Sequence, residues 1–209
     1  MTWEYEEQAQ IEGFQYICGV DEAGRGPFAG PVCAAAVILP FGAVIDGLND
    51  SKKLSESKRE TVFTMIQEQA VAYAAVMVDE RIIDEINILQ ATYRAMTAAV
   101  RELSVQADFA YIDGNQIPPA LTIPSRAVVR GDAIIPSVAA ASIIAKVTRD
   151  RFMREMDKQY PVYGFAKHKG YGTKTHIQAL LTYGACPIHR KTFLRKFYQR
   201  YPDAPHSDK

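Results

Sequence analysis

Gly19-Val20-Asp21-Glu22-Ala23-Gly24-Arg25-Gly26-Pro27 follows a short apolar run that begins at Tyr16. The run is partly β-branched, so it predicts a buried strand over residues 16–21 with Asp21 at its tip. Two carboxylates at a strand end, followed by glycines that let the backbone approach a ligand closely, favour a metal site joined to a binding loop. Taken alone, the same residues also suit a solvated turn, because Asp and Gly are common in turns.

The segments on either side of this stretch predict an α/β fold with a mixed sheet. Apolar runs indicate further strands at residues 30–39, 71–78, 109–113 and 127–129, the first of which forms a hairpin with residues 16–21. Helical patterns cover residues 55–70 and 88–103, and a long helix starts at Pro136-Ser137. Strands that alternate with helices after an opening hairpin are typical of this class.

The long helix after Pro136-Ser137 is expected to bury one apolar face. That face consists of side chains at helical spacing, namely Val138, Ala141, Ala145, Thr148 and Phe152. The 209 residues are 48% hydrophobic, enough for one sizeable core. We expect a catalytic domain over residues 1–160, and a basic loop and helical extension over residues 161–209 that packs on the same domain.

A formal net charge of zero hides an asymmetry between the two parts of the chain. Residues 1–150 carry 12 Lys and Arg against 20 Asp and Glu, whereas residues 151–209 carry 12 against 4. The second part is also rich in Tyr and Phe, so it is typical of a surface that binds a polyanion. A solvated helical surface would have the same composition.

The cysteines and the apolar stretches bear on where the protein works. Cys18, Cys33 and Cys186 are odd in number and widely spaced, which fits neither a disulfide framework nor a zinc site and favours a reducing compartment. The chain shows no secretory pattern and no apolar stretch of about 20 residues. We expect a cytoplasmic monomer with no membrane partner.

Two nucleotide-binding motifs fit the glycine-rich stretch only superficially. Residues 24–29 satisfy G-x-G-x-x-A, but Pro27 and the apolar run after it predict a strand where a phosphate-binding helix is needed. A P-loop would need Lys and Ser or Thr where Arg25 and Gly26 stand. Nucleotide binding through either motif is therefore not expected.

Further carboxylates occur at the ends of predicted elements. Asp113 ends the apolar run 109–113, and Asp132 follows the brief strand 127–129. Neighbouring strands lie about 4.8 Å apart, so Asp21 and Asp113 on adjacent strands would reach one cation. Oxygen ligands without His or Cys select hard cations such as Mg²⁺ or Mn²⁺. The alternative is a scatter of unrelated surface acids.

Four motifs, in this order along the chain, resemble bacterial ribonuclease HII. They are Asp21-Glu22-Ala23-Gly24-Arg25-Gly26-Pro27, Asp50-Ser51-Lys52-Lys53-Leu54, the run AASIIAKVTRD at residues 140–150, and His168-Lys169-Gly170-Tyr171-Gly172-Thr173. The resemblance implies an RNase H-like fold, a mixed central sheet flanked by helices with a C-terminal helical extension. It also implies an endonuclease that hydrolyses the RNA strand of RNA-DNA hybrids and cuts 5′ of single ribonucleotides in duplex DNA. The short segment before the first strand favours the type II enzymes over the type III enzymes, which carry an extra N-terminal domain.

The resemblance also assigns roles to individual residues. The catalytic and metal-binding residues would be Asp21, Glu22, Asp113 and Asp132, which would hold two Mn²⁺ or Mg²⁺ ions for two-metal hydrolysis. The substrate-binding residues fall into three groups. Gly24, Arg25 and Gly26 would contact the ribose 2′-hydroxyl, Tyr171 would stack at the RNA-to-DNA junction, and Lys52, Lys53, His168 and Lys169 would bind phosphates.

Other interpretations of these residues stay open at this point. The chain could be a hybrid-binding protein without turnover, or an RNase H-like phosphotransferase that cuts all-DNA substrates. Lys52 and Lys53 also suit solvation of a helix entry. The remaining polar candidates are expected to be structural or surface residues rather than nucleophiles, and these are Ser142, Thr148, His176 and His189.

Overall fold

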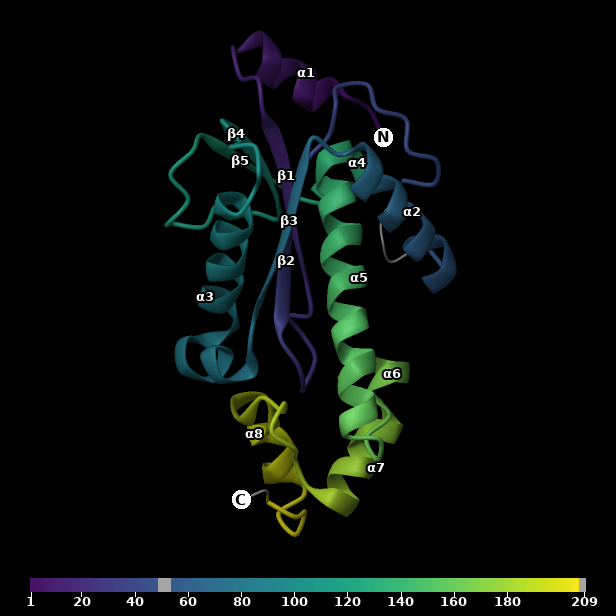
Figure 1. Ribbon diagram of the computed structural model, residues 1–209. Coiled ribbons are helices and arrows are strands. Elements are labelled where there is room, and N and C mark those ends of the chain that lie inside the picture. The colour runs from purple at the N-terminus through teal and green to yellow at the C-terminus, as the bar shows by residue number, and fades with distance from the viewer. Residues whose placement is uncertain (49–53, 207–209) are drawn as a thin grey trace.

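The computed structural model describes residues 1–48 and 54–206, and a mixed sheet of five strands lies at its centre, in the order β3-β2-β1-β4-β5 (Figure 1). β1 pairs antiparallel with β2 and parallel with β4, while β3 and β5 form the outer strands. The strands are β1 Ile17–Ala23, β2 Val32–Ile38, β3 Ala72–Val78, β4 Phe109–Asp113 and β5 Ser125–Val128. The predicted α/β class, with an opening hairpin and a mixed sheet, is confirmed.

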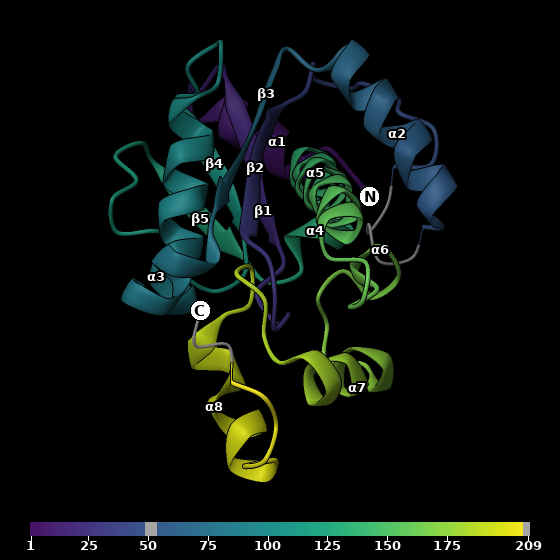
Figure 2. The same cartoon turned by 60° about the horizontal axis from the view of Figure 1, so that its bottom comes forward.

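Helices cover both faces of the sheet. α3 (Glu80–Arg101) packs on one face, and α5 (Pro136–Gln159) with α2 (Glu56–Gln69) packs on the other (Figures 1 and 2). Every residue of β2 is buried, as expected for a strand covered on both sides. α3 consists of two helical segments joined at Asn87, where φ is +67°. The Asp79 side chain caps the first segment, which was not predicted, and the Asn87 side chain caps the second, which agrees with the predicted 88–103.

β1 carries the first acids of the site, and its side chains alternate between the two faces. Cys18 and Val20 belong to the core beneath α3. Gly19 and Asp21 therefore face α5. A Cβ at Gly19 would lie 2.1 Å from the backbone nitrogen of Val138, so only glycine lets the first turn of α5 rest directly on β1.

The long helix α5 is buried more completely than its pattern predicts. Val138, Ala141 and Ala145 are inaccessible to solvent, as expected. Thr148 is only partly buried, and Phe152 is partly buried against an apolar cluster that includes Phe165, so the predicted stripe holds less well in its second half. Instead, the buried side chains there include the charged residues Arg149 and Asp150, which an apolar pattern cannot reveal.

The N-terminal helix α1 (Glu4–Ile11) was not predicted from the sequence. Its buried Glu6 carboxylate accepts hydrogen bonds from the backbone N–H of Ser137 at 3.2 Å and from the Ser137 hydroxyl at 2.9 Å. A carboxylate at this position satisfies free N–H groups and favours the positive end of the helix dipole. α1 therefore caps α5, which itself has no side-chain N-cap.

Three helices follow α5 and lie beyond one end of the sheet (Figures 1 and 2). They are α6 Phe165–His168, α7 Lys174–Tyr183 and α8 Lys191–Arg200, and they share a hydrophobic cluster with Ala29 and Met153. The Asp84 carboxylate of α3 accepts from the backbone N–H groups of Lys191 and Thr192, so it ties the start of α8 to the body. The loop and smaller helices expected in this region are confirmed, whereas the domain boundary at residues 160–161 stays a prediction.

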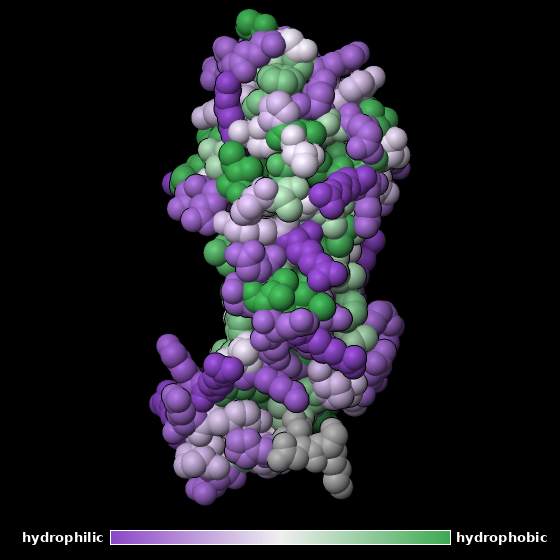
Figure 3. Space-filling view, turned by 90° about the vertical axis from the view of Figure 1, so that its left-hand side faces the viewer, coloured by the Kyte–Doolittle hydropathy of each residue, from purple (hydrophilic) through white to green (hydrophobic). Residues whose placement is uncertain are grey.

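The surface over the C-terminal helices is strongly hydrophilic on the face shown in Figure 3. The exposed basic residues of α8 are Lys191, Arg195, Lys196 and Arg200. Among the described residues, we find no helix that combines the length and the apolar character needed to cross a membrane.

Candidate active site

Three aspartates that are far apart in the sequence meet at one edge of the sheet. Asp21, Asp113 and Asp132 each offer a carboxylate oxygen, and these oxygens lie within 4.8 Å of one another. Val20 pairs with Ile112 in the parallel β1–β4 ladder, so the next residues of the two strands, Asp21 and Asp113, lie side by side. The prediction that these two acids reach one cation position from adjacent strands agrees with this geometry.

Asp132 reaches the pair from the helix that follows β5. α4 (Gly131–Ile134) is preceded by Arg130, whose φ of +61° is in the left-handed region and turns the chain sharply. The backbone N–H of Asp132 then lies 3.4 Å from Oδ1 of Asp113. The turn therefore brings the third carboxylate to the face of the sheet that α5 covers.

Glu22 lies on the other face of β1 and is not part of the three-aspartate group. It lines a small cavity with Asp113 and with α3 residues such as Tyr93 and Met96. Its carboxylate pairs with the Arg25 guanidinium at 3.3 Å. Because successive strand residues point to opposite faces, the four predicted acids divide into a group of three and one further acid beside Asp113.

Burial and mutual repulsion make the carboxylate cluster electrostatically unfavourable without a cation. Burial is the main cause that raises the pKa of Asp21 well above its usual value, and the charges of Glu22 and Asp113 raise it further. Burial also raises the pKa of Glu22, against the lowering effect of Arg25. The Ser142 hydroxyl of α5 hydrogen-bonds to Asp21. Oxygen-only ligands that repel one another suit a hard divalent cation.

The Gly-Arg-Gly loop, residues 24–26, leaves β1 directly after the acids. Gly24 has a φ of +92°, and a Cβ there would lie 2.0 Å from Nε of the buried Arg149. The Gly24 and Arg25 carbonyls accept hydrogen bonds from the Arg190 guanidinium at 2.6 and 2.9 Å. Sequence reasoning missed both arginines, because an arginine in a basic segment gives no sign that it is buried.

Tyr171 lies beside this loop, as the predicted substrate contacts require. A Cβ built at Gly26 would be 3.7 Å from the Tyr171 ring, and that side chain is 45% exposed. Phe28 N–H donates to the Gly170 carbonyl at 2.9 Å, which joins the two glycine-rich loops. The structure therefore brings Arg25, Gly26 and Tyr171 together on one surface, whereas Gly24 is buried beside them.

His168 and Lys169 point inward, in contrast to the exposed position that phosphate binding would need. Nε2 of His168 bonds to the Tyr163 carbonyl at 2.8 Å, and Nδ1 accepts from the Gly170 N–H at 3.2 Å. Lys169 is 7% exposed, and its ammonium donates to the Ala166 carbonyl. These contacts give both side chains a part in holding the loop, so their phosphate-binding role stays a prediction without support from this geometry. Lys52 and Lys53 lie outside the described residues.

A chain of neutral histidines supports the Tyr171 loop from below. Nδ1 of His189 accepts from the Cys186 N–H at 2.8 Å, so its proton is on Nε2, which lies 2.9 Å from Nε2 of His176. Nδ1 of His176 then donates to the Tyr171 carbonyl at 3.0 Å. Burial lowers the pKa of His176 to about 4 and that of His189 to about 3. Both are structural, as expected from the sequence.

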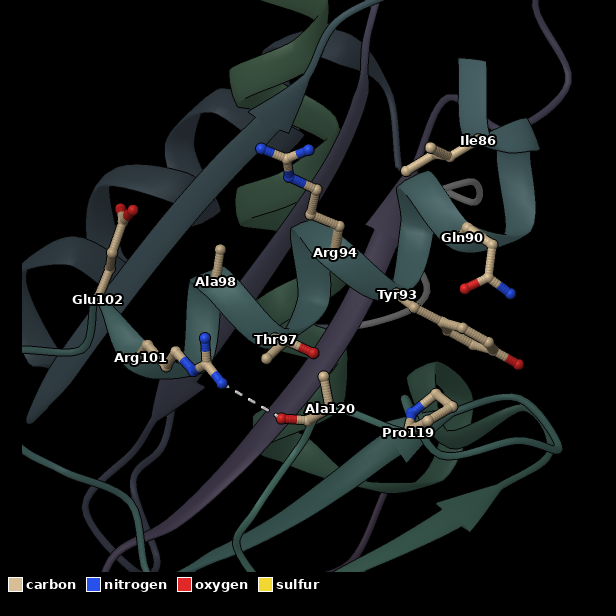
Figure 4. A pocket seen from close by; sticks show the side chains of 10 residues that line it. All are labelled: Ile86, Gln90, Tyr93, Arg94, Thr97, Ala98, Arg101, Glu102, Pro119 and Ala120. Carbon is tan, nitrogen blue, oxygen red and sulfur yellow. Dashed lines mark hydrogen bonds between the residues drawn. The ribbon is translucent and has the colours of Figure 1, made fainter. Parts of the chain in front are cut away.

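A separate cavity of about 620 Å³ lies between α3 and the loop after β4 (Figure 4). Tyr93 lines both this cavity and the small cavity beside Glu22. The lining of the larger cavity includes Ile86, Ala98 and Pro119 but none of the four predicted acids. The carboxylate cluster, and not this cavity, is therefore the candidate active site.

The fold and the acidic cluster together define a nuclease of the ribonuclease H-like class. The crystal structure of ribonuclease H2 from Pyrococcus horikoshii OT3 matches with a TM-score of 0.74 and 28% sequence identity, over 90% of this chain and all of that chain. The RNase H-like fold implied by the sequence motifs is confirmed.

Residues 18–200 match the family model of ribonuclease HII. Ribonuclease HII of Ruminiclostridium cellulolyticum is 54% identical over 197 residues, which are 93% of this chain and 76% of that protein. Ribonuclease HII of Endomicrobium trichonymphae is 58% identical over 182 residues, 87% of each chain. The chain belongs to the ribonuclease HII family. It is a type 2 ribonuclease H, an endonuclease that degrades RNA in RNA-DNA hybrids.

Replacing Asp21 with Asn should stabilise the metal-free protein at neutral pH. The folded-state pKa of Asp21 is raised, so its protonated carboxyl contributes to stability. This contribution is fully present at low pH and is lost as the pH rises through the folded-state pKa. Removing the charge should add about 1–3 kcal/mol and raise Tm by roughly 2–10 °C. Thermal unfolding in EDTA at pH 7.5 measures this, with the exposed Asp46→Asn as control. A lower Tm for Asp21→Asn than for the control would contradict it.

The histidine chain predicts a loss of stability in mild acid. The folded-state pKa values of His176 and His189 lie below the ordinary value of 6.5. The stability that their neutral side chains contribute is therefore fully present above pH 6.5 and is lost as the pH falls towards 4. Between pH 7 and 5.5 we expect the free energy of unfolding to fall by about 1–3 kcal/mol. Urea unfolding of Asp21→Asn measures it without the opposing effect of Asp21. Adding His189→Gln should reduce the fall, adding the exposed His206→Gln should not, and an equal fall in all three would contradict the assignment.

Proposed function

We propose that this enzyme also cuts 5′ of single ribonucleotides embedded in duplex DNA, and that it works by two-metal-ion hydrolysis. The observation that carries this proposal is the juxtaposition of the carboxylate cluster with the loop of residues 24–26 and Tyr171. In this proposal the carboxylate cluster binds the cations, and the loop with Tyr171 recognises the ribose. Both lie at the end of β1, so the sugar that is read is next to the phosphate that is cut.

The acids fit a pair of Mn²⁺ or Mg²⁺ ions. Asp21, Asp113 and Asp132 would hold one ion, and Glu22 beside Asp113 would help to hold a second. When bound, the cations would activate water and stabilise charge on the leaving 3′-oxygen. Ser142 and the Glu22 N–H orient the Asp21 carboxylate, the latter at 2.6 Å. Arg25 holds Glu22 in the same way from the loop.

The Gly-Arg-Gly loop and Tyr171 supply the ribose recognition in this proposal. Gly26 is exposed and carries no side chain, so the backbone N–H groups of Arg25 and Gly26 can reach a 2′-hydroxyl, while glycine at 24 makes room for the buried Arg149. The half-exposed ring of Tyr171 lies against Gly26 and offers a face for the sugar or base at the junction. A deoxyribose lacks the hydroxyl, which leaves those donors unpaired and disfavours all-DNA substrates.

The setting that we propose for this activity is the reducing cytoplasm, with the enzyme as a monomer. Cys18, Cys33 and Cys186 are free thiols, and the first two are buried. Burial raises the pKa of all three to about 12, so they stay unreactive. A chain with unpaired, inert thiols suits a compartment in which disulfides are not formed.

Cleavage of a DNA duplex that contains one ribonucleotide tests the proposal. We expect a single cut on the 5′ side of the ribonucleotide with Mn²⁺ or Mg²⁺, and no cut in the all-DNA duplex. Asp113→Asn should lower kcat/KM by about a thousandfold while binding is retained, because the metal ligands act on the reaction and not on the duplex. Asp46→Asn is the control. Absence of the cut with both metals, or an unchanged rate in Asp113→Asn, would refute the proposal.

Binding should depend steeply on salt if the basic C-terminal helices lie along the duplex. The slope of log K against log salt is about −0.9 for each phosphate contact on B-form DNA. Replacing Arg195 and Lys196 together with Gln should make the slope shallower by about 2 units if both contact phosphates. The control is Arg126→Gln on β5, at the far end of the molecule (Figure 1). Equal slopes in the two variants would show that α8 faces away from the substrate.

A further inference from the structure

Two buried arginines beneath the Gly-Arg-Gly loop have no part in the mechanism described so far. Arg149 is 1% exposed and Arg190 is fully buried. Their hydrogen bonds go to six backbone carbonyls, three from each guanidinium. Arg149 donates to Ala29, Pro31 and Lys169, and Arg190 donates to Gly24, Arg25 and Gly30. Burying a cation costs desolvation free energy that these hydrogen bonds must offset, and burial lowers the pKa of Arg190 to about 9.

Arg190 sets the direction in which two consecutive peptide units point. Its Nη2 bonds to the Gly24 carbonyl and its Nη1 to the Arg25 carbonyl. In a trans peptide the N–H points away from the C=O, and the described residues contain no cis peptide. The N–H groups of Arg25 and Gly26 must therefore point away from Arg190. They form a pair of donors on the surface of the loop, beside Tyr171.

The guanidinium is itself held in place from several sides. Its Nε donates to the Gly30 carbonyl at 2.9 Å, and its Cζ lies over the Phe193 ring, 5.0 Å from the ring centroid. Arg149 lies under Gly24 and leaves no room for a side chain there. Two cations below the loop also polarise its peptide units, which makes the outward N–H groups stronger donors.

We propose that Arg190 is a positioning residue that determines how well the enzyme separates ribose from deoxyribose. This inference rests on the proposed function, in which residues 24–26 read the 2′-hydroxyl. Arg190 does not touch substrate; it orients and polarises the N–H groups that do. A lysine would keep the charge but not the planar fork that bonds two carbonyls at once, so it cannot hold both peptide units.

The test compares binding of two duplexes that differ in one 2′-hydroxyl. In the Asp113→Asn background, Kd is measured for a duplex with one ribonucleotide and for the same duplex in all-DNA form. Adding Arg190→Lys should shrink the ratio of the two Kd values by about tenfold or more, because only the hydroxyl-dependent contacts are lost. Binding of the all-DNA duplex should change by less than about twofold.

A matched control separates positioning from stability. Leu194→Ala removes a buried side chain from the first turn of α8, so it lowers Tm without touching the loop. It should leave the Kd ratio unchanged. If Arg190→Lys does not fold, as judged by circular dichroism, Arg190→Gln replaces it, because its side chain is shorter and lacks the guanidinium fork.

The outcomes distinguish the two proposals. A ratio that falls in the Arg190 variant and not in Leu194→Ala supports the role of Arg190. A ratio that is unchanged in the Arg190 variant, or that falls equally in both, overturns it. If the parent Asp113→Asn protein shows no preference for the ribonucleotide and the unmodified enzyme does not cut beside it, the proposed function fails instead.

Discussion

The parallel pairing of β1 with β4 is the constraint on which the active site depends. Val20 opposite Ile112 places Asp21 beside Asp113, and both then face α5. A shift of one residue would turn one of the two carboxylates to the opposite face of the sheet. Gly19 secures the same face, because the absence of a side chain lets α5 lie directly on β1. The register therefore decides both the packing of the longest helix and the position of the acids.

Charges of both signs are buried around this pairing. The aspartates repel one another, and burial raises the pKa of Asp21. A few residues away, Arg149 and Arg190 are buried on carbonyls of the loops that they hold. Local strain of this kind is typical of functional sites, where the surrounding fold compensates for it. Here the compensation comes from the apolar clusters on both sides of the sheet.

Most of the fold could be predicted because buried strands and capped helices leave local patterns. The run at residues 109–113 is β4 with the same ends, and the run at 16–21 is β1 with ends shifted by one or two residues. α1 was not predicted, because its stabilising contact joins Glu6 to Ser137, which lies 131 positions away in the sequence. Thr148 was predicted to be buried but is only partly buried, for the same reason. The neighbouring Arg149 is buried in its place, by loops that come from elsewhere in the chain.

By itself the sequence determined the class of the fold and the family resemblance, because these follow from residue types at short spacings, and through that resemblance it nominated the four acids. Only the tertiary structure decided how they are arranged. It separated Glu22 from the three aspartates, turned His168 and Lys169 inward, and placed Arg190 under the loop of residues 24–26. The physical reason is that a backbone carbonyl accepts a hydrogen bond from any donor that folding brings near it, so its partner leaves no trace in local sequence.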